Sequence, residues 1–320
     1  MPSPEILLAR RLTKRLELSP PVAIETIVRK YADVVFAAIP VPGVDGVCLD
    51  LKVPGKAPRV IVNDNNPATR KRFTLAHELG HILIPWHLGS IIDDIDVPPS
   101  SPTFYGDLER EANAFAAEVL MPEPWIRGIV SKIDNLARVH GAIAKTCNVS
   151  PYAAARRLSG FLPAGSAYAS VKGKQIQFAG RSEGTIAVQL LEGTSLSSDA
   201  YDYADHHYTF KYGDAELHWW RLPSSMTLNV EDGRSWREVL NSIASEICDS
   251  MEAAIAMKQS VNGVAAFANS VAKRTESYTQ ESVAAACIQR FKDREEFAAF
   301  VKHEDFETYV SKRAAAFFED

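Results

Sequence analysis

The most informative stretch of this chain is His77-Glu78-Leu79-Gly80-His81. In an α-helix of about 3.6 residues per turn, the two histidines project from one face, about 40° apart, so both imidazoles can bind the same metal ion. Glu78 points to one side of that face, where its carboxylate can act as a general base on a water molecule instead of binding the metal. The stretch therefore predicts a catalytic zinc site of the metallopeptidase type.

The residues around this stretch predict a buried helix. Asn66 followed by Pro67 is typical of a helix start, with Asn66 as the N-cap, and Pro85 ends the helix one turn after the second histidine. Upstream, residues 59–62 are typical of a strand. In a buried helix, two imidazoles beside a carboxylate are unfavourable without a metal ion, which favours the zinc site over an ordinary core helix.

A zinc enzyme of this type needs a third protein ligand and an open fourth position. His87 follows the first histidine by ten residues, as the third histidine of metzincins does, but Ile84 stands where that pattern requires glycine. The alternative ligand is on a predicted helix that Asp107 caps and that ends before Pro122, where Glu109 and Asn113 share one stripe. Glu109 could bind the metal while Asn113 accepts the free ring N–H of a ligating histidine.

Two separated motifs occur in order along the chain: Arg72-Phe73-Thr74-Leu75-Ala76-His77-Glu78-Leu79-Gly80-His81, and then Glu109 to Asn113 with Phe115-Ala116-Ala117-Glu118-Val119-Leu120-Met121-Pro122. Together they resemble the ImmA/IrrE family of metallo-endopeptidases, over roughly residues 20–160. The resemblance implies zinc ligands at His77, His81 and Glu109, and a catalytic glutamate at Glu78. Glu111 also precedes Ala-Asn, but the four-residue offset to Asn113 favours Glu109, and we expect Glu111 on an exposed face.

The resemblance implies a zinc-dependent endopeptidase with Zn²⁺ as cofactor, in which Glu78 takes a proton from the attacking water. The oxyanion that forms needs a donor besides the metal, and Tyr105 and His87 are both candidates. The family further implies a protein substrate among transcriptional repressors, such as a helix-turn-helix repressor, in stress or mobile-element regulation.

Two other functions are compatible with the same residues. One is a non-catalytic, zinc-stabilised regulator that binds a repressor or DNA. The other is a peptidase component of a toxin–antitoxin or phage-defence system, which differs in biology rather than in chemistry. Replacing Glu78 by Gln separates the first from an enzyme, because it should abolish catalysis while leaving zinc and partner binding nearly intact.

Composition restricts the remaining possibilities. The 320 residues are 46% apolar, which is enough for two domains, and the net charge of −5 argues against DNA binding. The four cysteines occur singly, which predicts reduced thiols. No apolar stretch approaches the roughly 20 residues of a membrane span, and no signal peptide opens the chain, so we expect a cytoplasmic protein without a membrane partner. The oligomeric state has no signature in the sequence.

We expect an α+β fold in two parts. Residues 1–163 form a zincin-like peptidase domain, with a small sheet and active-site helices, that includes a helix-turn-helix-like segment at 139–158 with a structural role. Residues 164–320 form a sensing or substrate-selecting domain, β-rich to about residue 232 and then helical.

Within the second part, the pattern predicts a strand at 185–191 and an interruption of the helical region at Asn262-Gly263. In the first part, the segment 89–105 contains an acidic loop and could cover the zinc site, which would make the protein latent.

Overall fold

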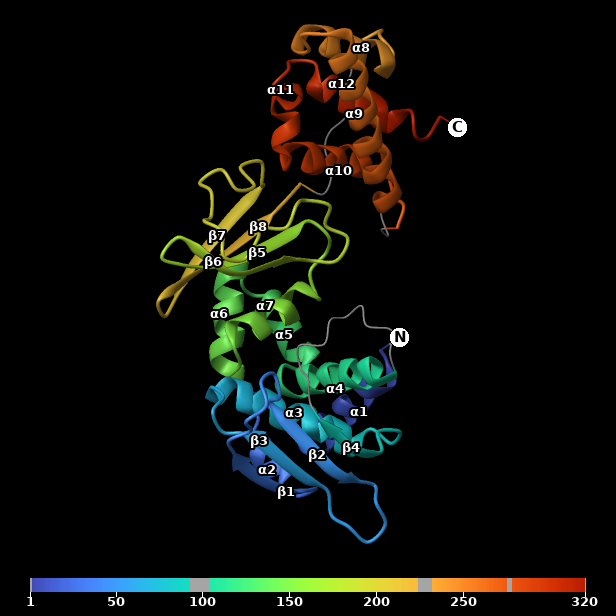
Figure 1. Cartoon of the computed structure of the whole chain (residues 1–320). Coiled ribbons are helices and arrows are strands. Elements are labelled where there is room, and N and C mark those ends of the chain that lie inside the picture. Colours follow the sequence, from blue (N-terminus) through green and yellow to red (C-terminus); the bar gives the residue numbers. More distant parts are fainter. Residues whose placement is uncertain (1, 93–103, 224–231, 275–277, 320) are drawn as a thin grey trace. The chain divides into compact units, whose positions relative to one another are not determined.

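The computed structural model describes residues 2–92, 104–223, 232–274 and 278–319. The chain divides into two units, Met1–Leu158 and Ser159–Asp320, each with helices and a four-stranded sheet (Figure 1). The expected α+β fold class is therefore confirmed. The acidic loop, at residues 93–96, lies outside the described residues.

A four-stranded sheet forms one layer of the first unit. Its strands are β1 (Asp33–Ala37), β2 (Gly46–Leu51), β3 (Arg59–Asn63) and β4 (Gly89–Ile92), in the spatial order β1-β3-β2-β4. β1 and β3 are parallel, whereas β2 is antiparallel to both of its neighbours. The strand expected at 59–62 is β3, in which Val60 and Val62 are fully buried.

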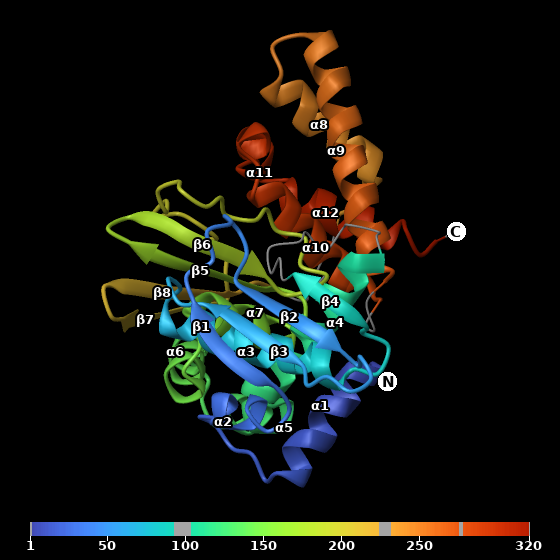
Figure 2. The ribbon, with the colours of Figure 1, turned by 60° about the horizontal axis from the view of Figure 1, so that its bottom comes forward.

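Helices form the rest of the first unit. They are α1 (Pro4–Arg15), α2 (Ile24–Val28), α3 (Ala68–Leu83), α4 (Phe104–Leu120), α5 (Glu123–Val130), α6 (Leu136–Cys147) and α7 (Pro151–Ser159). α3 packs against β2 and β3, α4 runs along α3, and α1 packs on α4 (Figures 1 and 2). α3 is thus enclosed between the sheet and another helix, which explains why its second half is buried.

The start of α3 differs by one residue from the expectation. Pro67, not Asn66, is the N-cap residue, and no side chain caps the first turn. The side-chain amide of Asn66 instead donates a hydrogen bond to the carboxylate of Asp45. The expected N-cap was wrong because a tertiary contact competes for the same polar side chain.

An antiparallel sheet opens the second unit. Its strands are β5 (Ser166–Lys172), β6 (Gln175–Arg181), β7 (His206–Tyr212) and β8 (Ala215–Arg221), in the order β6-β5-β8-β7. The ring of Tyr168 packs onto Gly180 of the neighbouring strand, where a Cβ atom would lie 2.3 Å from the tyrosine hydroxyl oxygen. The glycine therefore makes room for a buried aromatic side chain.

The strand expected at residues 185–191 does not form. Side chains, rather than a neighbouring strand, satisfy its backbone carbonyls: Arg290 donates to the carbonyl of Ile186, Arg181 to that of Ala187, and the Tyr201 hydroxyl to that of Val188. This run is a loop in which Ile186, Ala187 and Leu190 pack against the core, whereas Val188 and Leu191 are exposed.

Helices complete the second unit. They are α8 (Trp236–Ile247), α9 (Met251–Ala272), α10 (Gln280–Lys292), the 3₁₀ helix η1 (Glu295–Phe297), α11 (Ala298–Val301) and α12 (Phe306–Ala315). α9 continues through Asn262 and Gly263, so the expected interruption was wrong. A glycine costs a helix interior only about 1 kcal/mol, and burial of the neighbouring Val261 and Val264 outweighs this.

Candidate metal centre

Helix α3 carries the stretch from His77 to His81 and buries it. Residues 74–81 are all buried, and the side chains of His77, Glu78 and His81 have no exposed surface. Two histidines four residues apart in a helix lie on the same face, which here is directed toward α4. The candidate site is thus inside the first unit, between two helices.

The two helices approach each other closely at Gly80. A Cβ atom at this position would lie 3.2 Å from Cα of Ala112 and 3.2 Å from Cδ1 of Phe115, both on α4. Real Cβ contacts are rarely so short, so a larger residue at position 80 would push the helices apart. The glycine lets α4 bring Glu109 next to the histidines of α3.

His77, His81 and Glu109 form a buried cluster. Their ligand atoms all lie within 4.8 Å of one another, and each side chain is at most 1% exposed. The two Nε2 atoms are 2.9 Å apart, and the Glu109 carboxylate oxygens lie 3.2 Å from Nε2 of His77 and 3.5 Å from Nε2 of His81. Three potential ligand atoms from two helices thus converge on one point.

The chemistry of these groups fits a divalent metal ion. Within the described part of the chain, neither carboxylate oxygen of Glu109 accepts a hydrogen bond. A buried carboxylate beside two ring nitrogens that face each other is unfavourable unless a cation lies between them. Two imidazole nitrogens and one carboxylate oxygen are also a donor set that zinc enzymes use, with a fourth position left open.

Asn113 sets the orientation of one of the two rings. Its side-chain oxygen lies 3.0 Å from Nδ1 of His77, one helical turn beyond Glu109 on α4. Because an amide oxygen only accepts hydrogen bonds, Nδ1 of His77 donates, and Nε2 keeps a lone pair for a metal. Burial, with His77 and His87 nearby, lowers the pKa of His81 well below its ordinary value, so this imidazole is neutral as well.

His87 lies behind His81 and is not part of the cluster. Its Nδ1 is 2.7 Å from Nδ1 of His81, and its Nε2 is 2.9 Å from a carboxylate oxygen of Glu111. Both ring nitrogens of His87 therefore have partners. The ring lies on the side of His81 that faces away from Glu109. For Tyr105, the other candidate oxyanion donor, the side chain lies outside the described part of the chain.

Glu78 is close to the cluster but does not belong to it. Its carboxylate lies against the first residue of β2, where a Cβ atom on Gly46 would be 2.5 Å from Oε1 of Glu78. A Cβ atom there would also lie 2.6 Å from Cγ2 of Thr74. The sheet therefore forms one wall of the space that holds the glutamate.

Lys52 holds the chain where α3 ends. Its ammonium group donates hydrogen bonds to the backbone carbonyls of His81 (2.8 Å), Ile84 (2.6 Å) and His87 (2.6 Å). Partial burial lowers the pKa of Lys52 to about 8. Sequence reasoning missed Lys52 and Gly46, because no local pattern marks a residue whose role comes from how β2 packs on α3.

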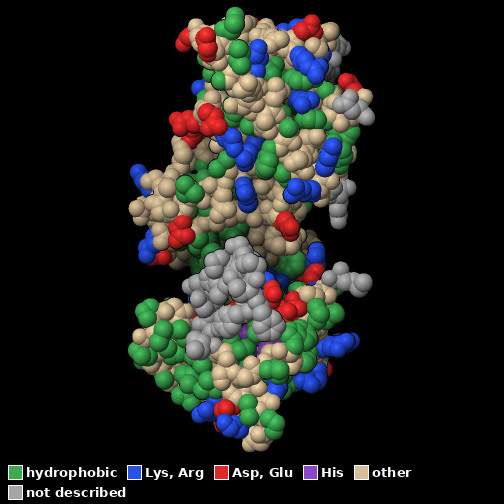
Figure 3. Space-filling view, turned by 45° about the vertical axis from the view of Figure 1, so that its right-hand side comes forward, with side chains coloured by type: hydrophobic (Ala, Val, Ile, Leu, Met, Phe, Trp, Pro, Cys, Tyr) green, Lys and Arg blue, Asp and Glu red, His purple; other side chains and the backbone are tan. Residues whose placement is uncertain are grey.

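The segment expected to resemble a helix-turn-helix consists of α6 and α7. Arg157 donates a hydrogen bond to the carbonyl of Met121 and forms an ion pair with Glu118. Both of these partners lie within the first unit. On the face that Figure 3 shows, Lys and Arg side chains stand among apolar and acidic ones. The structural role of residues 139–158 stays a prediction, and the inward contacts of Arg157 agree with it.

Comparison with known proteins agrees with this geometry. The sequence profile of the IrrE N-terminal-like domain matches residues 29–159, which contain the whole cluster. These residues belong to the ImmA/IrrE family. The expected resemblance is thereby confirmed, and the ImmA/IrrE domain of this chain is a metallopeptidase-like domain whose cluster can hold a divalent metal ion.

One characterised relative shares part of this domain. The "Radiation response metalloprotease IrrE" of Deinococcus radiodurans is 31% identical over 112 residues, which are 34% of this chain and 33% of the relative. The match therefore spans about a third of the relative's length. Among the described residues, no helix is both long and apolar enough to cross a lipid bilayer.

Proposed function

We propose that this chain is a zinc-dependent endopeptidase that hydrolyses peptide bonds of a protein substrate. His77, His81 and Glu109 would hold the metal, and Asn113 would orient the ring of His77. When bound, zinc would supply Lewis-acid chemistry to a water molecule and to the scissile carbonyl. Glu78 would take a proton from the attacking water and deliver it to the leaving amine.

The observation that carries this proposal is the separation of roles within one helix. Two neighbouring residues of α3, His77 and Glu78, have no exposed surface, yet only His77 contributes to the cluster. The Glu78 carboxylate lies against Gly46 instead, which suits the separate role of a general base. Of the two candidate oxyanion donors, His87 has both ring nitrogens engaged, which favours Tyr105.

Metal content and cleavage test the proposal together. Elemental analysis of the purified chain should find close to one zinc per molecule, lost in His77→Ala and in Glu109→Ala. Glu78→Gln should keep the zinc but lose cleavage of a fluorogenic peptide library. A chain without metal, or a Glu78→Gln variant that cleaves like the wild type, would overturn the proposal.

We also propose that the substrate is a transcriptional repressor, cleaved in stress or mobile-element regulation. Family membership of residues 29–159 supports a protein substrate in general. Incubation of the chain with candidate helix-turn-helix repressors, followed by mass spectrometry, should find a single cut that Glu78→Gln abolishes. A repressor bound equally by both forms and never cut would favour the non-catalytic regulator instead.

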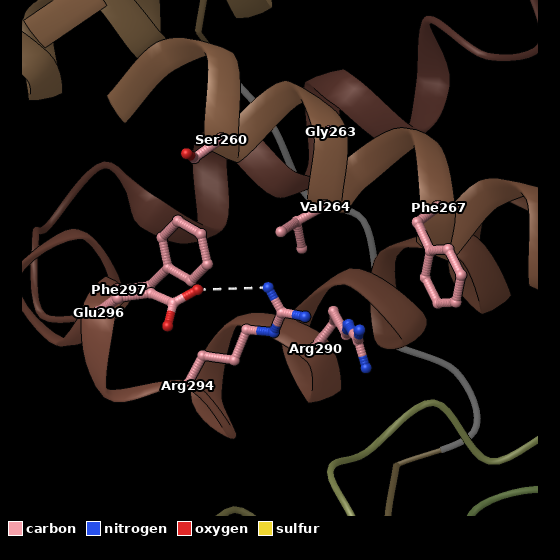
Figure 4. A pocket seen from close by; sticks show the side chains of 8 residues that line it. All are labelled: Ser260, Gly263, Val264, Phe267, Arg290, Arg294, Glu296 and Phe297. Atoms are coloured by element: carbon pink, nitrogen blue, oxygen red, sulfur yellow. Dashed lines mark hydrogen bonds and ion pairs between the residues drawn. The ribbon is translucent and has the colours of Figure 1, made fainter. Parts of the chain in front are cut away.

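For residues 164–320 we propose a sensing role, supported by a pocket between α9 and α10 of about 320 Å³ (Figure 4). Arg290 of α10 and Arg294, which directly precedes η1, line it together with apolar side chains that include Phe267 of α9. Glu296 also lines the pocket and pairs with Arg294 (Figure 4). The Arg290 guanidinium carbon lies 4.9 Å from the centre of the Phe267 ring. Gly263 leaves open space, since no atom would lie within 4 Å of a Cβ there. Guanidinium groups beside apolar walls suit a small organic anion.

Thermal-shift measurements on the full chain test this pocket, with benzoate and inorganic phosphate as probes. Benzoate should raise the melting temperature and change the rate of peptide cleavage. Arg294→Gln and Gly263→Leu should remove the shift, whereas Arg237→Gln should keep it, because Arg237 stacks on Trp236 outside this pocket. Absence of any melting-temperature shift with benzoate would count against the proposal. A shift with phosphate alone would indicate that the pocket binds an anion without using its apolar walls, and would also count against it.

A further inference from the structure

Three buried imidazoles, those of His77, His81 and His87, form a continuous chain. The Nε2 atoms of His77 and His81 face each other at 2.9 Å, and the Nδ1 atoms of His81 and His87 face each other at 2.7 Å. All three side chains have no exposed surface. The chain ends on two oxygen acceptors of α4: Asn113 beside His77 and Glu111 beside His87.

Glu111 accepts hydrogen bonds from two residues that follow α3. Its Oε2 lies 2.9 Å from Nε2 of His87 and 2.6 Å from the indole Nε1 of Trp86. The sequence pattern placed Glu111 on an exposed face, but its side chain is only 29% exposed and contacts a fully buried histidine. The carboxylate therefore connects α4 to the turn after α3.

The hydrogen positions along this chain follow from the acceptors at its ends. A carboxylate only accepts hydrogen bonds, so Nε2 of His87 carries the hydrogen and Nδ1 of neutral His87 is an acceptor. Nδ1 of His81 must then donate to it, which leaves the lone pair of His81 on Nε2. That nitrogen is the one that faces Glu109 and His77.

We infer that His87 and Glu111 act as a positioning pair that fixes the tautomer and ring orientation of His81 for metal binding. The inference rests on the proposed zinc site and assigns to His87 and Glu111 the part that Asn113 plays for His77. Each histidine of the cluster then has its own acceptor on the side away from the metal. The negative charge of Glu111, transmitted through His87, also makes His81 a better donor to a cation.

The backbone around His87 supports this positioning. The amide of His87 donates to the carbonyl of Ile84 at 3.3 Å, and the Lys52 ammonium binds the carbonyls of both residues. The turn that follows α3 is therefore held from two sides, one through β2 and one through α4. A histidine on such a turn presents its ring to His81 in one orientation.

Zinc affinity, measured by competition with a chelator at one fixed pH, tests the pair. His87→Ala and Glu111→Ala should each weaken zinc binding about 10- to 100-fold. Glu111→Gln keeps an acceptor oxygen without the charge and should lose less. The matched control is Asp107→Asn, an exposed acidic residue of the same helix, and it should bind zinc like the wild type.

A second measurement separates positioning from a purely structural role. The melting temperature of the metal-free protein should be nearly the same in the wild type and in Glu111→Gln, whereas the zinc affinity differs. Unchanged zinc affinity in His87→Ala would overturn the inference while leaving the zinc site intact. Complete loss of zinc in His87→Ala, as in His77→Ala, would make His87 a ligand and also overturn it. A wild type that binds no zinc would instead refute the proposed function itself.

Discussion

Gly46 lies so close to Glu78 that a Cβ atom on the glycine would be 2.5 Å from Oε1 of the glutamate. Gly46 begins β2 and pairs with Val62 of β3, so its backbone is held by the sheet. The glutamate in turn belongs to a helix that packs on β2. Neither residue can move away without disrupting packing elsewhere. The absence of a side chain at position 46 therefore leaves the space that the Glu78 carboxylate occupies.

Gly46→Ala should therefore displace the Glu78 carboxylate and lower peptide cleavage by about 100-fold, since a shift of about 1 Å in a reacting group has effects of that size. Zinc content should stay near that of the wild type, because the atoms nearest to an added Cβ belong to Glu78 and Thr74, which are not cluster residues. Gly128→Ala, where an added Cβ meets no atom within 4 Å, is the control. Loss of zinc in Gly46→Ala would show that the whole site is disrupted.

Lys52→Met should destabilise the end of α3. The substitution leaves three carbonyls without their charged donor. A hydrogen bond to a charged group contributes about 1.5 to 3 kcal/mol. We expect a lower free energy of unfolding in urea and faster amide exchange at residues 82–88. Lys56→Met, which removes an exposed ion pair with Asp50, should change stability far less. Equal effects of the two substitutions would contradict the prediction.

Asn113→Ala should weaken zinc binding about 10- to 100-fold, because Nδ1 of His77 loses its acceptor. Asn113→Asp keeps an acceptor oxygen at the same position and should bind zinc close to the wild-type level. Chelator competition gives both affinities. If the alanine variant bound zinc as tightly as the aspartate variant, the contact between Asn113 and His77 would have no role in metal binding.

His140 predicts a pH dependence of stability. It is fully buried in α6 and donates to the carbonyl of Pro151 at 2.7 Å, and burial lowers its pKa from 6.5 to about 4. The folded state thus takes up this proton less readily than the unfolded state, so the stability is fully present above pH 6.5 and falls as the pH drops from 6.5 toward about 4.

His140→Gln tests this dependence, because its side-chain amide can still donate but does not titrate. As the pH is lowered from 7 to 4.5, the wild type should lose more free energy of unfolding than the variant does. Urea denaturation at several pH values measures this difference. A difference that stays constant over this range would refute the buried-histidine explanation.

Local sequence patterns were enough to predict features that depend on a single helix or strand. The spacing of His77 and His81 put both imidazoles on one face of α3, and the spacing of Glu109 and Asn113 did the same on α4, because helical periodicity alone relates residues four apart. Strand β3 was predictable from its own run of β-branched residues. Periodicity does not relate one helix to another, and it was the resemblance to the ImmA/IrrE family that linked the two helical motifs.

Other features depended on what packs against each element. Asn66 was expected to cap α3 but binds Asp45, and residues 185–191 were expected to pair as a strand but have their carbonyls bound by side chains. In both cases a partner distant in sequence competes with the local preference. Propensity and periodicity describe the energy of an isolated segment, so they miss such a partner.

The sequence by itself determined that this chain has a helix with two histidines and a glutamate arranged for metal chemistry. Only the tertiary structure decided that Gly46 and Lys52 of the sheet region confine that helix, and that His87 and Glu111 meet behind His81. The physical reason is that a residue's face on a helix follows from local geometry, whereas its neighbours follow from how separate elements pack.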